Sequence, residues 1–322
     1  MEENKELLSV KNLTIYYFTD DGVVKAVNGI DFTLNKGETL GLVGETGAGK
    51  TTTALGLMRL IPDPPGKIVE GEILWEGKDI MKLSKAAMRT IRGKEISMIF
   101  QDPMTSLNPV MTVGDQLAEV VRIHEKVSRA DAYKRAGEML ELVGIPAERM
   151  EEYPHQFSGG MRQRVVIAMA LACNPQMIIA DEPTTALDVT IQAQVLDLMR
   201  NLRKQMGTAT LMITHDLGVV AEICDRVAIM YAGQIVESGT ISDIYDDTKH
   251  PYTIGLFGSL PDMDSKVHRL RPIPGLMPDP ANLPTGCPFH PRCDKACPDC
   301  AVKTPKQTEV APGHFVRCLL YE

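Results

Sequence analysis

The sequence has no apolar run of the roughly 18–20 residues that a transmembrane helix needs. Its first eight residues carry three glutamates and lack the basic and then apolar segments of a secretory signal. It also lacks an excess of positive charge, because the formal net charge is -8 at pH 7. These absences argue against a membrane-spanning chain and against a nucleic-acid binder with a broad basic face, and a cytosolic location is expected.

Cysteine is scarce and unevenly placed. Cys173 and Cys224 stand alone, whereas the other five of the seven cysteines fall between Cys287 and Cys318. Structural disulfides are not expected in a reducing cytosol. The two isolated cysteines are therefore assigned to core packing, and the cluster of five needs a separate explanation.

The composition is that of an ordinary globular protein, with 44% hydrophobic and 24% charged residues in a chain of 322. Short apolar runs in residues 9–44 predict strands, and apolar residues three and four apart predict helices farther on. The other predicted elements are helices near 50–60, 113–126, 129–143, 160–172 and 191–206, strands at 177–180 and 210–214, and a hairpin at 226–237. This alternation predicts an α/β fold with a mainly parallel sheet.

The composition changes near residue 250, from where proline is frequent up to Pro312. Such a segment cannot form long helices or central strands. We therefore expect two parts, a layered domain of residues 1–249 with a helical portion at about 102–160, and an irregular extension of residues 250–322. Because the extension contains few large apolar residues, something other than regular structure is expected to hold it together.

A phosphate-binding loop follows the strand predicted before residue 44. The pattern G-x-x-x-x-G-K-[ST] is matched by Gly44, Glu45, Thr46, Gly47, Ala48, Gly49, Lys50 and Thr51, with Thr52 next. Its backbone N–H groups would bind an anion, Lys50 would reach the outer phosphates of a nucleotide, and Thr51 would offer a hydroxyl to Mg²⁺. The alternative is a glycine-rich turn that precedes Lys-Thr by chance, which the flanking strand and helix disfavour.

Two acidic residues end the apolar run at 177–180. A carboxylate at the end of a buried strand is costly unless it meets a cation, so Asp181 is assigned to Mg²⁺. Glu182 would then orient or deprotonate an attacking water. His215 follows another predicted strand and could reach a γ-phosphate. The alternative readings are a surface acidic pair and an ordinary surface histidine.

A second candidate anion site opens the helix predicted from Gly160. Ser158, Gly159 and Gly160 stand at its start, where backbone N–H groups are available. A single nucleotide has no use for two such sites in one chain. Two chains packed head to tail would use both, with Ser158 and Gly160 of one chain closing on the nucleotide of the other.

In chain order, these motifs resemble those of the ABC transporter ATPases. The set comprises the phosphate loop, Gln101, Ser158-Gly159-Gly160, Asp181-Glu182, Ala186-Leu187-Asp188 and His215, and it spans residues 9–240. The resemblance implies a RecA-like parallel-sheet core with an antiparallel β subdomain and a helical subdomain. It also implies that ATP and Mg²⁺ bind, that Tyr17 stacks on adenine (with Tyr16 as the alternative), and that Gln101 contacts Mg²⁺ and reports to a membrane partner.

Other segments are similar to one branch of this family, the D-type ATPase subunits of dipeptide and oligopeptide permeases. They are residues 180–194, His250-Pro251-Tyr252-Thr253 and residues 286–293, and Met161 in the second anion site is common in that branch. The resemblance implies an ATP-hydrolysing subunit that drives peptide import from the cytoplasmic face of the membrane. Its partners would be a second ATPase subunit, two transmembrane permease subunits and an extracytoplasmic peptide-binding protein. Dipeptides, longer peptides and nickel chelates remain open as substrates.

The clustered cysteines suggest a bound metal. A proline-rich segment with little core needs a stabilising cross-link, and in a reducing compartment a metal is more stable than a disulfide. The spacing excludes the bacterial ferredoxin run, whereas zinc held by four Cys, or by Cys with His290 or His314, is possible. The family resemblance implies a [4Fe–4S] cluster, with Zn²⁺ and free thiols as alternatives. It implies the ligands Cys287, Cys293, Cys300 and Cys318, and Cys297 is then extra. Since the nucleotide motifs end by about residue 240, ATP binding is expected to survive loss of these cysteines.

Two functions of other classes compete with transport. A soluble ABC protein acting on ribosomes or DNA would usually carry two motif sets or a long coiled coil, and this chain has one set and no sustained heptads. A small-molecule kinase with a phosphate loop would leave Ser158-Gly159-Gly160 unexplained.

Overall fold

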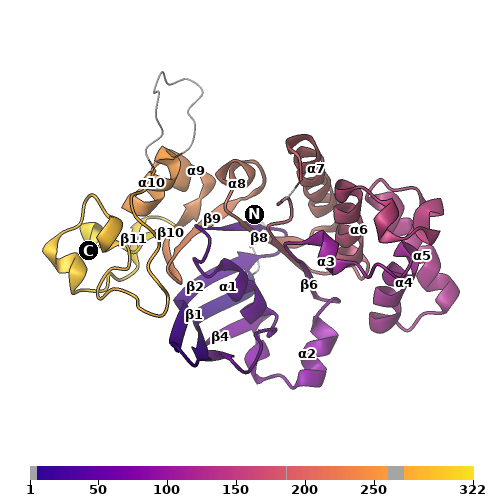
Figure 1. Cartoon of the computed structure of the whole chain (residues 1–322), viewed down its shortest axis with the longest axis horizontal. Helices are drawn as coiled ribbons and strands as arrows, with labels where there is room; N and C mark the ends of the chain where they lie inside the picture. The colour runs from indigo at the N-terminus through magenta and orange to yellow at the C-terminus, as the bar shows by residue number, and fades with distance from the viewer. Residues whose placement is uncertain (1–5, 186, 260–271) are drawn as a thin grey trace. The chain divides into compact units, whose positions relative to one another are not determined.

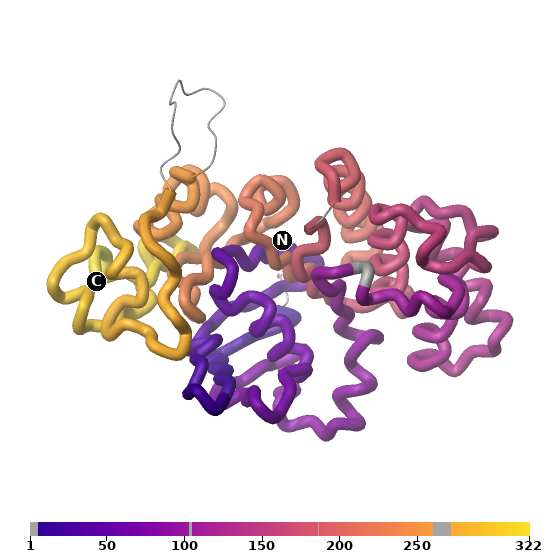
Figure 2. The backbone as a smooth tube through the Cα atoms, in the orientation of Figure 1, coloured from indigo at the N-terminus to yellow at the C-terminus, as the bar shows by residue number. Residues whose placement is uncertain are grey.

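The structure is a computed structural model that describes residues 6–185, 187–259 and 272–322 (Figures 1 and 2). The chain divides into two compact units, each built from several stretches of sequence. The first unit comprises Met1–Leu7, Leu34–Thr39 and Asp79–Thr214, and the second comprises Leu8–Thr33, Leu40–Lys78 and His215–Glu322. No helix in the described ranges is both long and apolar enough to span a membrane.

The first unit contains three parallel strands in the order β8-β7-β6. They are β6 (Ile96–Ile99), β7 (Met177–Asp181) and β8 (Ala209–Thr214). Every residue of β7 and β8 is buried, as expected for central parallel strands covered on both faces. The predicted strands at 177–180 and 210–214 are confirmed.

The helices of the first unit include a group of α4, α5 and α6, which Figure 1 shows together. The unit contains α2 (Lys85–Ile91), α3 (Pro103–Ser106), α4 (Val113–His124), α5 (Arg129–Leu142), α6 (Gly159–Leu171), α7 (Val189–Met206) and the 3₁₀ turns η1 (Ile80–Lys82), η2 (Ala147–Glu151) and η3 (Pro154–Gln156). Thr112, Ser128, Ser158 and Asp188 cap α4, α5, α6 and α7 through their side-chain oxygens. Gly207 ends α7 in the left-handed conformation, as the sequence predicts.

The second unit contains two sheets. One has the order β2-β1-β4-β5, with β1 (Glu6–Thr19) antiparallel to β4 (Gly66–Trp75), and includes β2 (Gly22–Asn35) and β5 (Lys78–Asp79). In the other, β3 (Thr39–Val43) is parallel to β9 (Arg226–Tyr231), which pairs with β10 (Gln234–Thr240) in the predicted hairpin. The unit also contains α1 (Lys50–Leu57), α8 (Leu217–Ile223), α9 (Ile241–Asp246) and α10 (Pro251–Gly258). The expected parallel core and antiparallel β subdomain are both confirmed.

Helix α1 ends three residues before the predicted position. Its last residue is Leu57, whereas the sequence pattern predicts a helix to about Leu60. The cause is local, because Arg59 adopts a positive φ of 49°, which a right-handed helix cannot accommodate.

The extension is irregular over much of its described length, as expected, but it also contains two short strands that the sequence analysis did not predict. Its last residues form β11 (Thr308–Ala311) and β12 (His314–Val316), and β12 pairs with β10 through Glu237 and Val316. The physical reason is that residues 306–311 and 313–322 contain no proline, so both segments can offer N–H groups to a sheet. Besides α10, the extension also contains the short turns η4 (His290–Arg292), η5 (Pro298–Ala301) and η6 (Leu319–Tyr321).

A buried carboxylate ties the extension to β10. Glu237 accepts hydrogen bonds from the backbone N–H groups of Lys249 (2.7 Å) and His250 (3.0 Å), and its Oε1 lies 2.9 Å from Nε2 of His314. Glu237 and His314 are both fully buried. An aromatic cluster of Tyr231, Tyr252 and Phe289 adds a small core. The extension therefore has more internal support than its composition suggests.

Candidate nucleotide site

The phosphate loop, residues 44–51, connects β3 to α1 in the second unit. Two of its glycines are required by space. A Cβ on Gly44 would lie 2.2 Å from the backbone oxygen of Met230. One on Gly49 would lie 2.4 Å from the backbone oxygen of Ala26, and Gly49 also has a φ of 104°. The loop thus lies directly against neighbouring backbone, which no other residue would allow.

Lys50 is folded back onto its own loop. Its side chain is buried, and Nζ donates to the backbone oxygens of Gly44 (2.7 Å) and Glu45 (3.1 Å). The N-cap of α1 is Gly49, which has no side chain that could cap the first N–H groups of the helix. Thr51 is exposed in the first turn and Thr52 is half-buried. This arrangement suits phosphate binding by the backbone, with the ammonium group alongside.

Asp181, the last residue of β7, and Glu182, which follows it, lie in the first unit. Asp181 is 2% exposed at the strand end. Glu182 adopts a positive φ of 46° and donates its N–H to the backbone oxygen of Ile213 (2.8 Å). Its Oε2 accepts hydrogen bonds from Gln101 Nε2 (2.8 Å) and Thr185 Oγ1 (3.0 Å). The structure thus brings together Gln101 and Glu182, 81 residues apart, and adds Thr185, which the sequence analysis missed.

The second candidate anion site also lies in the first unit. Ser158 and Gly159 are exposed at the start of α6, and Ser158 Oγ accepts the N–H of Met161 (3.4 Å). Gly160 is buried instead, and a Cβ there would lie 2.4 Å from Cγ2 of Ile191. Glycine at position 160 therefore leaves room for Ile191 of α7 whether or not a nucleotide binds. Ala186, in the predicted loop before Asp188, lies outside the described residues.

The remaining predicted nucleotide contacts belong to the second unit. Tyr17 and Tyr16 are both half-buried on β1, opposite Gly66 and Lys67 of β4. A Cβ on Gly66 would lie 2.8 Å from the Tyr17 ring, so glycine makes room for that ring. Phe18, which the sequence analysis did not consider, is 50% exposed. His215 is exposed between β8 and α8.

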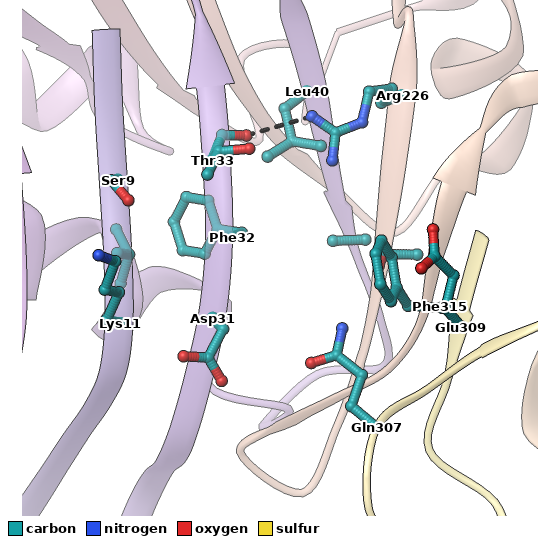
Figure 3. A pocket seen from close by; sticks show the side chains of 13 residues that line it. Ser9, Lys11, Asp31, Phe32, Thr33, Leu40, Arg226, Gln307, Glu309 and Phe315 are labelled. Atoms are coloured by element: carbon teal, nitrogen blue, oxygen red, sulfur yellow. Dashed lines mark hydrogen bonds between the residues drawn. The ribbon is translucent and has the colours of Figure 1, made fainter. Parts of the chain in front are cut away.

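A cavity of about 520 Å³ lies in the second unit (Figure 3). Phe32 and Phe315 line it, together with Arg226, which donates from Nη1 to the backbone oxygen of Thr33 (3.4 Å). Among the described residues, the lining includes none of the predicted nucleotide contacts. This cavity is therefore separate from the residues that the sequence predicts to bind nucleotide.

The four predicted metal-binding cysteines, Cys287, Cys293, Cys300 and Cys318, line one small cavity together with His250 and His290. All seven cysteines lie in the described ranges, and none forms a disulfide. Within those ranges, no three His, Cys, Asp or Glu side chains form a group that could hold a metal ion. The expected metal centre is thus not found as a formed group, although its donors share a cavity.

Burial shifts the pKa values of the four thiols that line the cavity. It raises the pKa of Cys287 to about 11 and also raises the pKa values of Cys293, Cys300 and Cys318. Cys297 does not line the cavity, but its Sγ lies 3.1 Å from Cys300 Sγ, and this hydrogen bond lowers its pKa. A residue that the sequence treats as extra therefore touches a predicted ligand.

Three histidines of the extension have other partners. His314 is bound to Glu237, and Nδ1 of His290 lies 2.8 Å from the backbone oxygen of Cys287. Burial lowers the pKa of His250 to about 3, so this ring is neutral. These contacts favour the thiols over His290 and His314 as donors. Cys173 and Cys224 are buried, as core packing requires.

Comparisons with known protein families match two regions of the chain. Residues 27–185 match the family described as "ABC transporter". Residues 236–300 match "Oligopeptide/dipeptide transporter, C-terminal region". The first region contains the phosphate loop and the acidic pair, and the second contains four of the clustered cysteines.

Curated relatives are similar over almost the whole chain. The oligopeptide transport ATP-binding protein OppD of Bacillus subtilis (strain 168) is 56% identical, over 98% of this chain and 88% of its own. The dipeptide transport ATP-binding protein DppD of the same organism is 52% identical, over 99% and 96%.

Solved structures are similar in fold. The ATP-binding cassette MJ0796, a dimer bound to ADP and Pi, has a TM-score of 0.65 and 27% identity over 73% of this chain and 99% of that one. CbiO1 from Clostridium perfringens, part of the ABC transporter complex cbiONQ, has a TM-score of 0.65 and 26% identity over 78% and 95%. The predicted cassette fold is confirmed.

Proposed function

The chain belongs to the ABC transporter family, as an ATP-binding subunit and ATPase, and we propose that it powers the import of short peptides across the cytoplasmic membrane. One observation carries the proposal. The likeness to peptide transport subunits extends through the extension as well as the nucleotide motifs, with 52–56% identity over 98–99% of the chain. The extension contains none of the nucleotide motifs. Its likeness to peptide transport subunits therefore supports a role in peptide transport in addition to ATP hydrolysis.

We propose the following roles within the nucleotide site. The phosphate loop and Lys50 bind the phosphates, and Tyr17 stacks on adenine. Thr51, Gln101 and Asp181 hold Mg²⁺, which would neutralise phosphate charge when bound; the hydroxyl of Thr51 and the buried carboxylate of Asp181 fit a hard cation. Glu182 takes a proton from water, and His215 contacts the γ-phosphate. The hydrogen bonds from Gln101 and Thr185 support this role of Glu182, because they orient its carboxylate.

We further propose that ATP binds between two ATPase subunits. The phosphate loop of one subunit would hold ATP, and Ser158 and Gly160 of the other would close on it. The dimeric MJ0796 cassette supports this arrangement by analogy. The other partners would be two transmembrane permease subunits and an extracytoplasmic peptide-binding protein. The chain itself would lie peripherally on the cytoplasmic face, with residues 1–249 as its cassette, including the helical portion at about 102–160, and residues 250–322 as its extension.

Uptake measurements in a strain lacking this gene test the proposed transport. Uptake of a labelled peptide should be lost in that strain and restored by the wild-type chain. The Lys50→Ala chain should fail to restore it, whereas Lys82→Ala, a change at an exposed lysine, should succeed. Parallel assays with a dipeptide, a longer peptide and a nickel chelate identify the substrate. Unchanged uptake of all three in the deletion strain would refute the proposal.

We propose a [4Fe–4S] cluster held by Cys287, Cys293, Cys300 and Cys318, with Zn²⁺ as the alternative. The shared cavity and the absence of disulfides at these positions support the assignment. Four thiolates suit either soft-metal centre, and a bound centre would link distant parts of the extension. The role of the residues is then structural, or sensitive to redox conditions.

Purification without oxygen tests this centre. The protein should be brown, with broad absorption at about 400 nm from thiolate–iron charge transfer. The Cys287→Ser variant should lose the colour, while the matched Cys297→Ser variant should retain most of it. Metal analysis distinguishes the iron–sulfur cluster from the zinc site. About one zinc per chain without iron would contradict the cluster and support the zinc site. A chain that contains neither metal would reject both.

A further inference from the structure

The extension makes direct contact with the phosphate loop. Arg292 donates from Nη1 to Glu45 Oε2 (2.9 Å) and from Nη2 to Glu45 Oε1 (3.2 Å). The Arg292 side chain is 7% exposed and that of Glu45 is 29% exposed, so the ion pair is largely shielded from solvent. A bidentate, largely buried ion pair of this kind fixes the position of the two side chains more firmly than a single contact on the surface.

The backbone of Glu45 is held at the same time. Its N–H donates to the hydroxyl of Tyr252 (3.1 Å), and its carbonyl accepts from the N–H of Ala48 (3.1 Å) and from Lys50 Nζ (3.1 Å). Tyr252 is fully buried, and its ring lies 4.6 Å from that of Tyr231 and 5.4 Å from that of Phe289. Every polar group of Glu45 therefore has a partner, and two of those partners come from residues beyond 250.

Arg292 is itself fixed within the cysteine-rich segment. It ends the turn η4, between Cys287 and Cys293 in the sequence. Its N–H donates to the backbone oxygen of Phe289 (2.9 Å), and its Nε donates to that of Pro274 (2.9 Å). The backbone N–H of Cys293 donates to the oxygen of His290 (3.3 Å) in the same turn. The N–H of His290 donates in turn to the backbone oxygen of Cys287 (3.1 Å). A shift of either cysteine would therefore move the turn that carries Arg292.

We propose that Arg292 is a positioning residue for the phosphate loop, through which the cysteine-rich extension sets the affinity for nucleotide. The inference rests on the proposed phosphate-binding role of the loop. It departs from the sequence-based expectation that ATP binding is independent of the extension. That expectation treated the nucleotide motifs as complete by residue 240, whereas Glu45 has partners at 252 and 292.

The physical reason is the flexibility of the loop. Gly47 and Gly49 have φ values of 84° and 104°, and glycine gives the unbound chain many alternative conformations. A loop already held in its binding conformation loses less entropy when phosphate arrives. Without Arg292, the Glu45 carboxylate would lose its two charge-assisted hydrogen bonds. The unbound phosphate loop would then sample more conformations, and binding of phosphate would cost more entropy.

Direct nucleotide titration of the full chain tests the proposal. The dissociation constant for Mg-ATP of Arg292→Gln should rise about 5- to 30-fold, the range that loss of charge-assisted hydrogen bonds allows. Arg292→Lys should recover only part of the loss, because an ammonium group cannot bind both carboxylate oxygens in the same way. Lys303→Ala, which removes an exposed ion pair elsewhere in the extension, should bind like wild type. Affinity of Arg292→Gln within twofold of wild type would overturn the inference.

A double-mutant cycle separates positioning from general destabilisation. Glu45→Gln and Arg292→Gln should each weaken binding, and the double variant should be little weaker than either one, because both remove the same contact. Additive losses would refute the coupling. Glu45→Gln keeps the test available if Arg292→Gln fails to fold. In hydrolysis assays with partner subunits, KM for ATP should rise while kcat changes little, because Arg292 does not touch the reacting atoms.

The cysteines provide the final arm. Cys293→Ser should weaken nucleotide binding in the wild-type background and have little further effect in Arg292→Gln. Equal losses in both backgrounds would show that the cysteine acts by another route and would reject the coupling through Arg292.

Lys50→Ala tests the loop itself. If Lys50→Ala leaves affinity unchanged, the proposed nucleotide site fails, whereas failure of the Arg292 variants alone rejects only the control by the extension.

Discussion

ATP hydrolysis by the Glu182→Gln variant is expected to fall about 10²–10⁴-fold, while the variant still binds ATP. Glutamine keeps the size of the side chain but cannot take a proton from water. The geometry supports so large an effect. Gln101 and Thr185 both donate to one carboxylate oxygen, and the N–H of Glu182 is fixed to Ile213. The positive φ of Glu182 is unusual for a residue with a side chain, and such strain is often found at functional sites.

The measurement is steady-state release of phosphate by the variant assembled with its partner subunits. Glu148→Gln, at an exposed glutamate of the same unit, is the matched control and should hydrolyse ATP normally. The hydrolysis-deficient variant should also favour association of ATPase subunits in Mg-ATP, detectable by light scattering. Near-normal turnover by Glu182→Gln would remove this residue from the catalytic role.

Lys50→Ala is expected to weaken binding of Mg-ATP itself, by about 10- to 100-fold. Two losses combine in this variant. The ammonium group no longer meets the phosphates, and the loop loses the hydrogen bonds from Nζ to the oxygens of Gly44 and Glu45. Because Lys50 is buried and α1 begins there, circular dichroism should accompany each titration to show that the helix persists.

Titration with a fluorescent nucleotide measures this loss directly, with Lys82→Ala as the control at an exposed lysine. Unchanged affinity of the Lys50→Ala chain would contradict the assignment of the phosphate loop. The two variants should therefore differ in kind, since one retains the nucleotide without hydrolysing it and the other fails to retain it. A common defect in both would indicate misfolding rather than two distinct roles.

Much of the local structure of this protein could be predicted from the sequence alone. The phosphate loop, the acidic pair at the end of β7 and the end of α7 at Gly207 all depend on neighbours within a few residues. Glycine conformation, helix capping and the burial of apolar runs act at that range, so residue order is enough to predict them. Even the early end of α1 is local, although the positive φ of Arg59 has no clear signal in the sequence.

Only the tertiary structure decided how distant segments meet. Nothing in the sequence around Glu45 indicates that Arg292, 247 residues later, binds both carboxylate oxygens of Glu45. The pairing of β12 with β10 and the packing of Gly160 against Ile191 were equally hidden. Charge, size and hydrogen-bonding capacity show what a side chain can bind. The choice of partner depends on which surfaces the folded chain brings within a few ångströms, and that information is spread over the whole sequence.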